Sequence, residues 1–74
     1  MSGKRAMIAG DHLFSESGRF DGMIGGDVVV AEGVELTLHG LVNGDLLIRA
    51  GAIVKLGAMV GGAVINKGGT VLTI

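Results

Sequence analysis

The sequence predicts an all-β chain that coils into a three-sided parallel β-solenoid, or β-helix, with 18 residues per rung. Three observations support this fold class. The chain matches itself when shifted by 18 residues, aliphatic residues recur at every sixth position, and glycines recur where such a coil turns its corners. A helical fold is disfavoured because each glycine costs about 1 kcal/mol relative to alanine and β-branched residues are abundant.

The repeat comprises residues 22–39, 40–57 and 58–74, which predict three full rungs. In solenoids of this kind each rung bonds only to the rungs beside it. A shift of 18 residues predicts the following columns: Leu36, Val54 and Leu72; Leu38, Leu56 and Ile74; Gly33, Gly51 and Gly69. The repeat period fits either hand of coil.

The residues before the repeat match it poorly. The stretch SGRFDG at 17–22 resembles the end of a unit and places Phe20 over Leu38. We therefore expect residues 13–21 to form a partial first rung, so that the solenoid domain covers 13–74. Residues 1–12 are expected to be a flexible N-terminal arm or cap.

Composition narrows the class of protein. The chain has 74 residues and no cysteine, so disulfides and thiolate metal sites are excluded, and we expect no bound metal or cofactor. A domain of this size is marginally stable alone, which favours oligomerisation. Apolar residues make up 49% and the mean hydropathy is +0.64.

Charge and hydropathy also bear on partners and location. The net charge of −1 offers no electrostatic case for nucleic-acid binding. No apolar run approaches the length of a transmembrane segment, and the apolar part of the N-terminus is too short for a signal peptide. We therefore expect a cytoplasmic protein.

Alternation along the strands predicts which side chains face outward. In each hexad counted from Gly22, odd places should point inward and even places outward. The second place is almost entirely apolar, although it shares its side with charged residues at the fourth place, and so predicts a surface for self-association or partner binding. Its apolar members are Met23, Val29, Leu41, Leu47, Ile53, Met59, Ile65 and Val71.

Two alternatives to an interaction surface remain open for these outward apolar residues. The N-terminal arm could cover one face with Met7, Ile8, Leu13 and Phe14. The corners could instead disturb the alternation and turn some of these side chains inward.

The ends of the stack are a second candidate for assembly. An uncapped terminal rung exposes strand edges and core side chains that can pair with another chain. The residues expected to stack at the terminal rungs are Phe14, Phe20, Leu72 and Ile74. Residues 1–40 hold three Lys/Arg and six Asp/Glu, whereas 41–74 hold three and one. This polarity favours head-to-tail contacts, which form filaments when they do not close.

Few residues suggest catalysis, and we expect no enzyme. Asp11, His12 and Ser15 are residue types found in hydrolases, but they lack the surrounding strand–turn–helix pattern. His39 is expected to be a solvated turn residue. Asn66, the one polar residue in an aliphatic column, suggests either a buried hydrogen-bonded step or, as we favour, a terminal rung open to water.

Asp27 and Asp45 repeat at one corner of the predicted coil. They could form a ladder of cation ligands. The favoured interpretation is that each carboxylate accepts local backbone hydrogen bonds in its turn, and Ala63 at the third position supports it.

The residues 22–62, GMIGGDVVVAEGVELTLHGLVNGDLLIRAGAIVKLGAMVGG, resemble the rungs of bactofilins, the polymer-forming cytoskeletal proteins of bacteria. The resemblance covers about 22–74. It implies a right-handed three-sided β-helix, polymerisation without nucleotide and a scaffolding role near the membrane.

The sequence thus leads to the hypothesis of a non-catalytic structural protein that self-assembles into an oligomer or filament. The alternative is a small β-solenoid binding module, such as an immunity protein or antitoxin, that occludes another protein. The expected partner is a second copy of the chain or another protein, without nucleic acid. Peripheral membrane contact is compatible with either hypothesis.

Overall fold

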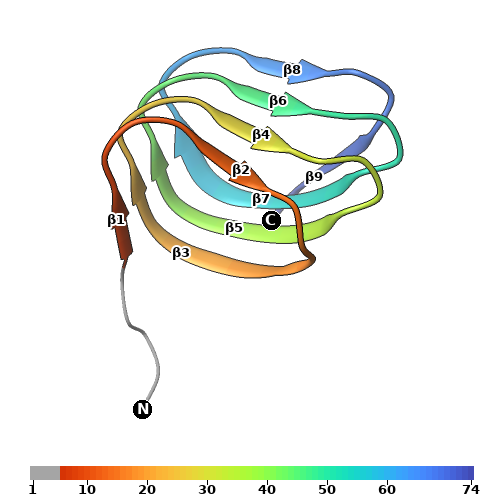
Figure 1. Cartoon of the computed structure of the whole chain (residues 1–74), viewed down its shortest axis with the longest axis horizontal. Helices are drawn as coiled ribbons and strands as arrows, with labels where there is room; N and C mark the ends of the chain where they lie inside the picture. The colour runs from red at the N-terminus through yellow and green to blue at the C-terminus, as the bar shows by residue number, and fades with distance from the viewer. Residues whose placement is uncertain (1–5) are drawn as a thin grey trace.

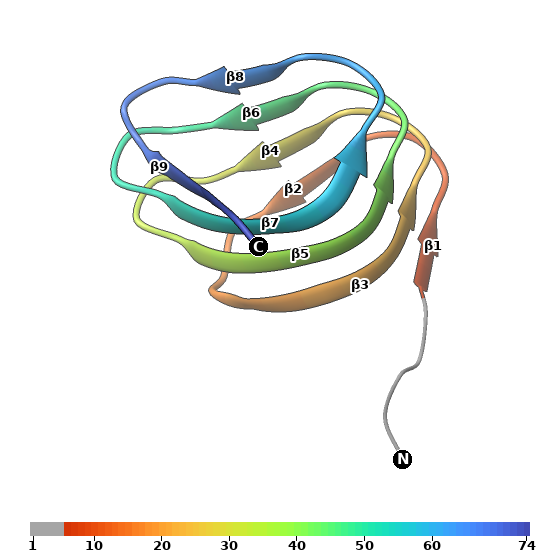
Figure 2. The same ribbon diagram turned by 180° about the vertical axis from the view of Figure 1, so that it is seen from behind.

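The computed structural model describes residues 6–74 as a stack of about four coils built from parallel β-strands (Figures 1 and 2). The strands are β1 (Ala6–Ile8), β2 (His12–Phe14), β3 (Gly18–Ile24), β4 (Val28–Val30), β5 (Glu35–Val42), β6 (Leu46–Ile48), β7 (Ile53–Val60), β8 (Val64–Asn66) and β9 (Thr70–Thr73). We call residues 6–21, 22–39, 40–57 and 58–74 the first to fourth coils. The structure confirms the predicted β-solenoid.

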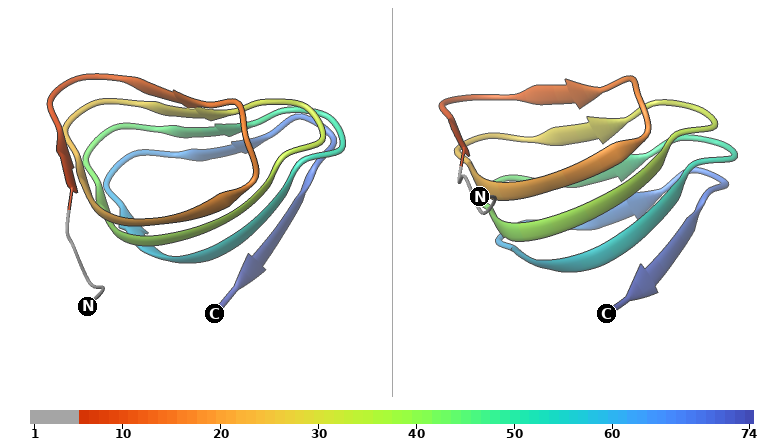
Figure 3. Two further views of the ribbon diagram at one scale, coloured as in Figure 1. Left: turned by 60° about the horizontal axis from the view of Figure 1, so that its bottom comes forward. Right: turned by 90° about the horizontal axis from the view of Figure 1, so that it is seen from below.

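Three sides arise from two sheets. One sheet has the order β1-β3-β5-β7-β9 and the other β2-β4-β6-β8. Strands β3, β5 and β7 are long and curve partway along their length, so that the first sheet forms two sides of the coil and the short strands form the third (Figures 1 and 3). In the middle of the chain, short strands therefore alternate with long bent ones, where the sequence predicted three short strands per coil.

The register keeps the period of 18 residues through the middle of the stack. Gly22 pairs with Gly40, and Gly40 with Ala58. The first coil is two residues shorter, because Met7 pairs directly with Met23. The stack includes Ala6–Ile8 and His12–Phe14, so the solenoid begins before residue 13, where its start was expected. Of the expected N-terminal arm, residues 1–5 lie outside the residues that the structure describes.

The fourth coil corrects two of the predicted columns. Asn66 still pairs with Ile48, in the same register as the coils before it, but Thr70 pairs with Ile53. One residue has been lost from the corner between β8 and β9. Val71 therefore lies over Val54, where Leu72 was expected, and Thr73 lies over Leu56, where Ile74 was expected.

The glycine with positive φ at that corner also lies one residue earlier than the repeat predicts. Gly33 and Gly51 adopt positive φ angles of 74° and 76° at equivalent turns. In the fourth coil the positive φ, 98°, belongs to Gly68 rather than to the predicted Gly69. The N–H of Gly51 donates to the carbonyl of Gly68 at 3.1 Å, so the two glycines lie close together at this corner.

The core fills the two middle coils, and all of its buried side chains occupy odd places, as predicted. Its fully or nearly fully buried side chains are Ile24, Val28, Val30, Val34, Leu36, Leu38, Val42, Leu46, Ile48, Ala52 and Val54. The columns stack aliphatic on aliphatic across coils about 4.8 Å apart, the spacing of paired strands. Burial of each such side chain contributes about 1.5–3 kcal/mol.

Aromatic rings fill the interior of the first coil. His12, Phe14 and Phe20 pair with the inward positions of the coil above, and each ring is half-buried. The rings of His12 and Phe14 lie 4.5 Å apart and those of Phe14 and Phe20 5.4 Å apart, both edge to face. Such contacts add about 0.5–1.5 kcal/mol to the burial of the rings. Bulky rings thus occupy the end of the core where the coil is shorter.

Gly40 lies at the bend of β5 (Figure 1). Its φ of +108° is disfavoured for residues with a side chain. A Cβ atom at this position would also collide with the carbonyl oxygen of Gly22 in the strand below. Glycine is therefore required where this long strand turns from one side of the coil to the next.

Candidate functional site

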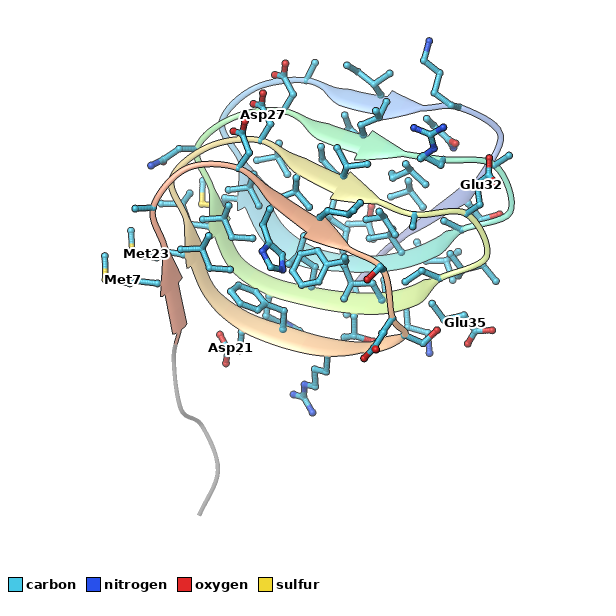
Figure 4. The ribbon with its side chains drawn as sticks, viewed as in Figure 1. Met7, Asp21, Met23, Asp27, Glu32 and Glu35 are labelled. Atoms are coloured by element: carbon cyan, nitrogen blue, oxygen red, sulfur yellow. The ribbon has the colours of Figure 1, made fainter. Side chains whose placement is uncertain are left out.

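The side of the coil formed by β1 and the ends of β3, β5 and β7 carries a continuous row of large apolar side chains. Register pairing stacks Met7, Met23, Leu41 and Met59 directly on one another. Met7 is 80% exposed, Met23 43% and Met59 75%, while Leu41 is half-buried. Met7 and Met23 project away from the ribbon in Figure 4. We call this row the methionine ridge and this side the methionine face.

The side formed by β2, β4, β6 and β8 carries a second row of the same kind. Leu13, Val29, Leu47 and Ile65 stack on one another through the paired register of these strands. Leu13 is 56% exposed and Ile65 37%, and the two between them are half-buried. We call this row the short-strand ridge. Two adjacent sides of the coil are thus apolar along the whole stack.

The third side is polar. Arg19 pairs with Thr37 and Thr37 with Lys55, all on the outside of the first parts of β3, β5 and β7. Leu72 continues this row in the fourth coil. We call this side the polar face. Substitutions on it can serve as controls for substitutions on the two apolar sides.

Six of the eight predicted interface residues lie on the two ridges: Met23, Val29, Leu41, Leu47, Met59 and Ile65. Ile53 is half-buried on the polar face. Val71 was placed wrongly, because the shorter fourth coil turns it inward over Val54, where it packs against the core.

Sequence reasoning missed Met7 and Leu13, which begin the two ridges. Both were assigned to an arm or to a partial rung, because the first coil matches the others at a shift two residues smaller than the repeat. The dipeptide Met-Ile occurs at residues 7–8 and again at 23–24. This match at the smaller shift could have indicated how the first coil pairs with the second. The residues suggested to cover one face, Met7 and Leu13 among them, belong to the strands themselves, and these two add to the exposed apolar surface.

A column of aspartates runs along the corner between the two apolar sides. The Asp11 carboxylate accepts the backbone N–H of Asp27 at 2.8 Å, Asp27 accepts that of Asp45 at 2.8 Å, and Asp45 accepts that of Ala63 at 2.9 Å. Asp27 is labelled at this corner in Figure 4. Each carboxylate thus satisfies a backbone donor that the corner removes from the regular strand pairing.

Glycines make room for these carboxylates. A Cβ atom on Gly26, Gly44 or Gly62 would collide with the aspartate oxygen of the coil below. The motifs GGD at 25–27 and NGD at 43–45 therefore couple two functions, an aspartate that serves the next coil and a glycine that makes room for the aspartate of the previous one. The motif GGA at 61–63 keeps only the glycine. The expected backbone hydrogen bonding is present, but its partner is the next coil and not the local turn.

The described residues contain no group of three or more His, Asp or Glu side chains placed to hold a metal ion. The hydrolase-like trio takes part in the fold instead. Asp11 belongs to the aspartate column, and His12 packs against Phe14. Ser15 is exposed. His39 lies within β5 beside the bend and is half-buried, so it is not the free turn residue that was expected.

Two hollows flank the methionine ridge. The larger, of about 720 Å³, lies between the ridge and the polar side chains of Arg19, Asp21 and His39. The smaller, of about 270 Å³, lies on the other side, against Ala9, Gly25 and Asn43. The ridge thus stands between two open depressions and presents its side chains to any surface that approaches.

The residues expected at the terminal rungs are only partly placed as predicted. Phe14 and Phe20 occupy the interior of the first coil. Leu72 faces outward at 47% exposure, and Ile74 is 61% exposed. Asn66 is exposed in the fourth coil, as favoured, and its amide bonds to the backbone of Gly69.

In the described part of the chain no helix is long and apolar enough to span a bilayer. Comparison of the chain with models of protein families, with curated proteins and with solved structures found no match.

Proposed function

We propose that this chain is a non-catalytic structural protein that self-assembles into a homo-oligomer or filament without nucleotide, as a bactofilin-like scaffold would. The observation that carries the proposal is the pair of apolar ridges that run through every coil on two adjacent outer sides. The proposal places the assembly in the cytoplasm, as expected from the sequence.

Physical reasoning supports association through these ridges. Exposed apolar patches that extend across a small protein usually mark interaction surfaces. Burial of a single Met, Leu, Ile or Val side chain gains about 1.5–3 kcal/mol. Eight such side chains stand in two rows, and only part of their gain is needed to offset the cost of association.

Sedimentation velocity over a wide range of protein concentration, with electron microscopy, tests the proposal. The unmodified chain should sediment as species larger than a monomer. Met23→Asp with Leu47→Asp should shift it towards the monomer, whereas Thr37→Asp on the polar face should leave its size unchanged. A chain that stays monomeric at high concentration would overturn the proposal.

The larger hollow favours a second candidate, a binding module that occludes a protein partner. Its mixed lining of Met23 and Leu41 beside Arg19, Asp21 and His39 combines apolar contact with polar groups that fix orientation. This candidate predicts a small species of fixed size that does not grow with concentration. The same sedimentation experiment therefore separates the two functions.

A further inference from the structure

The methionine face is unusual among the three sides because its ridge has uncharged neighbours. Beside Met7, Met23, Leu41 and Met59 lies a column of small or neutral residues, which are Ala9, Gly25, Asn43 and Gly61. Ionisable side chains appear only at the borders of this face, with Asp21 and His39 on one border and the aspartate column on the other. A partner can therefore cover the ridge without burying a charge.

Charge along the stack indicates the orientation of a second copy. The described part of the first two coils holds six carboxylates and a single cation, Arg19. The last two coils hold Arg49, Lys55 and Lys67 against a single carboxylate, Asp45. Two copies side by side in the same direction bring like charge beside like charge. Antiparallel copies bring acidic coils beside basic ones, which lowers the energy of the pair.

The face matches itself in this antiparallel arrangement. A twofold axis that runs along the strands between the second and third coils reverses the order of the ridge. Met7 of one copy then meets Met59 of the other, and Met23 meets Leu41. At one border Asp21 comes to the height of the second copy's His39, so that no two carboxylates meet there. At the other border Asp27 faces Asp45, a cost reduced because each carboxylate already accepts a backbone N–H.

We propose that two copies of this chain pair through the methionine face with their coil axes antiparallel, Met7 of each copy against Met59 of the other. This inference rests on the proposed self-assembly and names the contact and its orientation. Such a twofold contact uses the same patch on both copies and closes on itself.

The size of the face sets the strength of the pair. Four coils spaced by about 4.8 Å and strands of three to four residues give a contact of roughly 200–250 Å² per copy. A stable interface usually buries about 800 Å² per partner. The pair is therefore weak and depends on protein concentration, and it becomes persistent only when further contacts hold the copies together.

Cross-linking of single-cysteine variants tests the orientation, because the natural chain has no cysteine. Met7→Cys and Met59→Cys chains, one of them carrying a mass tag, are mixed and treated with a short thiol-reactive cross-linker. The antiparallel pair predicts the mixed Met7→Cys/Met59→Cys product in several-fold excess over either homodimer. Thr37→Cys on the polar face gives the background level.

Several outcomes would overturn the inference. Dominant Met7→Cys homodimers would show parallel pairing. Cross-linking no greater than that of Thr37→Cys in a chain that still oligomerises would show that another surface is used, and the proposed function would stand. A chain that stays monomeric at all concentrations would overturn both the antiparallel pairing and the proposed self-assembly.

A matched pair of substitutions measures the contribution of the face itself. Met23→Asp should weaken the pair at least about tenfold, because a carboxylate enters the apolar contact. Thr37→Asp, which places the same carboxylate on the polar face, should leave the affinity within about twofold. Equal effects of the two changes would contradict the assignment to the methionine face.

Discussion

Asn66 and Gly69 bond to each other twice across the corner at which the fourth coil loses a residue. The Asn66 side-chain amide N–H donates to the Gly69 carbonyl at 3.0 Å, and the Gly69 N–H donates to the Asn66 Oδ1 at 2.7 Å. Strand β8 keeps the register of the middle coils, whereas β9, from Thr70 onward, is shifted by one residue. The reciprocal bonds thus span the place where the register changes.

Replacement of Asn66 by alanine should therefore destabilise the fourth coil. Two hydrogen bonds are lost at an exposed corner, and each contributes about 0.5–1.5 kcal/mol. We expect the free energy of unfolding in urea to fall by about 1–2 kcal/mol. Asn43→Ala, an exposed asparagine at another corner, is the control and should change it by less than about 0.5 kcal/mol. Equal losses of stability in Asn66→Ala and Asn43→Ala would show that the two hydrogen bonds of Asn66 do not stabilise the fourth coil.

The new register makes opposite predictions for two neighbouring residues. Val71 packs inward over Val54, so Val71→Asp should lower the free energy of unfolding by about 1–3 kcal/mol through burial of a charge. Leu72 faces outward beside Lys55, so Leu72→Asp should change it by less than about 0.5 kcal/mol. Thermal unfolding followed by circular dichroism measures both. A larger loss of stability for Leu72→Asp than for Val71→Asp would contradict this register and support the 18-residue period in the fourth coil.

The aspartate column should be a stabilising feature of the corner. Asp27→Ala leaves the Asp45 N–H without its acceptor and should cost about 1–2 kcal/mol of stability, and Asp27→Asn should recover part of it because its amide oxygen can still accept. Glu32→Ala removes an exposed carboxylate at another corner and serves as the control. Denaturant unfolding of the three variants gives the comparison. Stability of Asp27→Ala equal to that of Glu32→Ala would show the column to be incidental.

Two glycines with positive φ should respond very differently to alanine. Gly40→Ala introduces a methyl group that collides with the carbonyl of Gly22, so we expect a loss of about 3 kcal/mol or more, or failure to fold. Gly33→Ala has open space around its new methyl group and should cost only the backbone strain, about 1 kcal/mol. Thermal denaturation of the two variants separates collision from strain. A folded Gly40→Ala with near-normal stability would contradict the close approach of the two strands.

The middle of the molecule could be predicted from sequence because stacking imposes one strict period. Ile24, Val42 and Val60 fall in one column, and the inward or outward direction of each neighbour follows from strand alternation. The outward position of Met23, Leu41 and Met59 was predicted for the same reason.

The ends could not be predicted because there the period is not kept. The first coil is two residues shorter, with the rings of Phe14 and Phe20 in place of aliphatic side chains, and a search at a fixed shift therefore assigned Met7 to an arm. In the fourth coil the order of Val71 and Leu72 depends on a hydrogen-bonded corner at Asn66, which hydrophobic pattern does not reveal. The aspartate bonds were missed as contacts between coils because the donor lies 18 residues away.

The aspartate column also implies that the stack can be lengthened only by whole repeats of 18 residues. A duplicate of residues 40–57 inserted after Gly57 would bring its own aspartate and glycine to the corner and set every inward side chain over another. The protein would then grow by one layer, about 4.8 Å, without a new fold. An insertion of one residue in the middle layers would instead turn the following core side chains outward. Lengthening by whole repeats is thus the change that this architecture tolerates best.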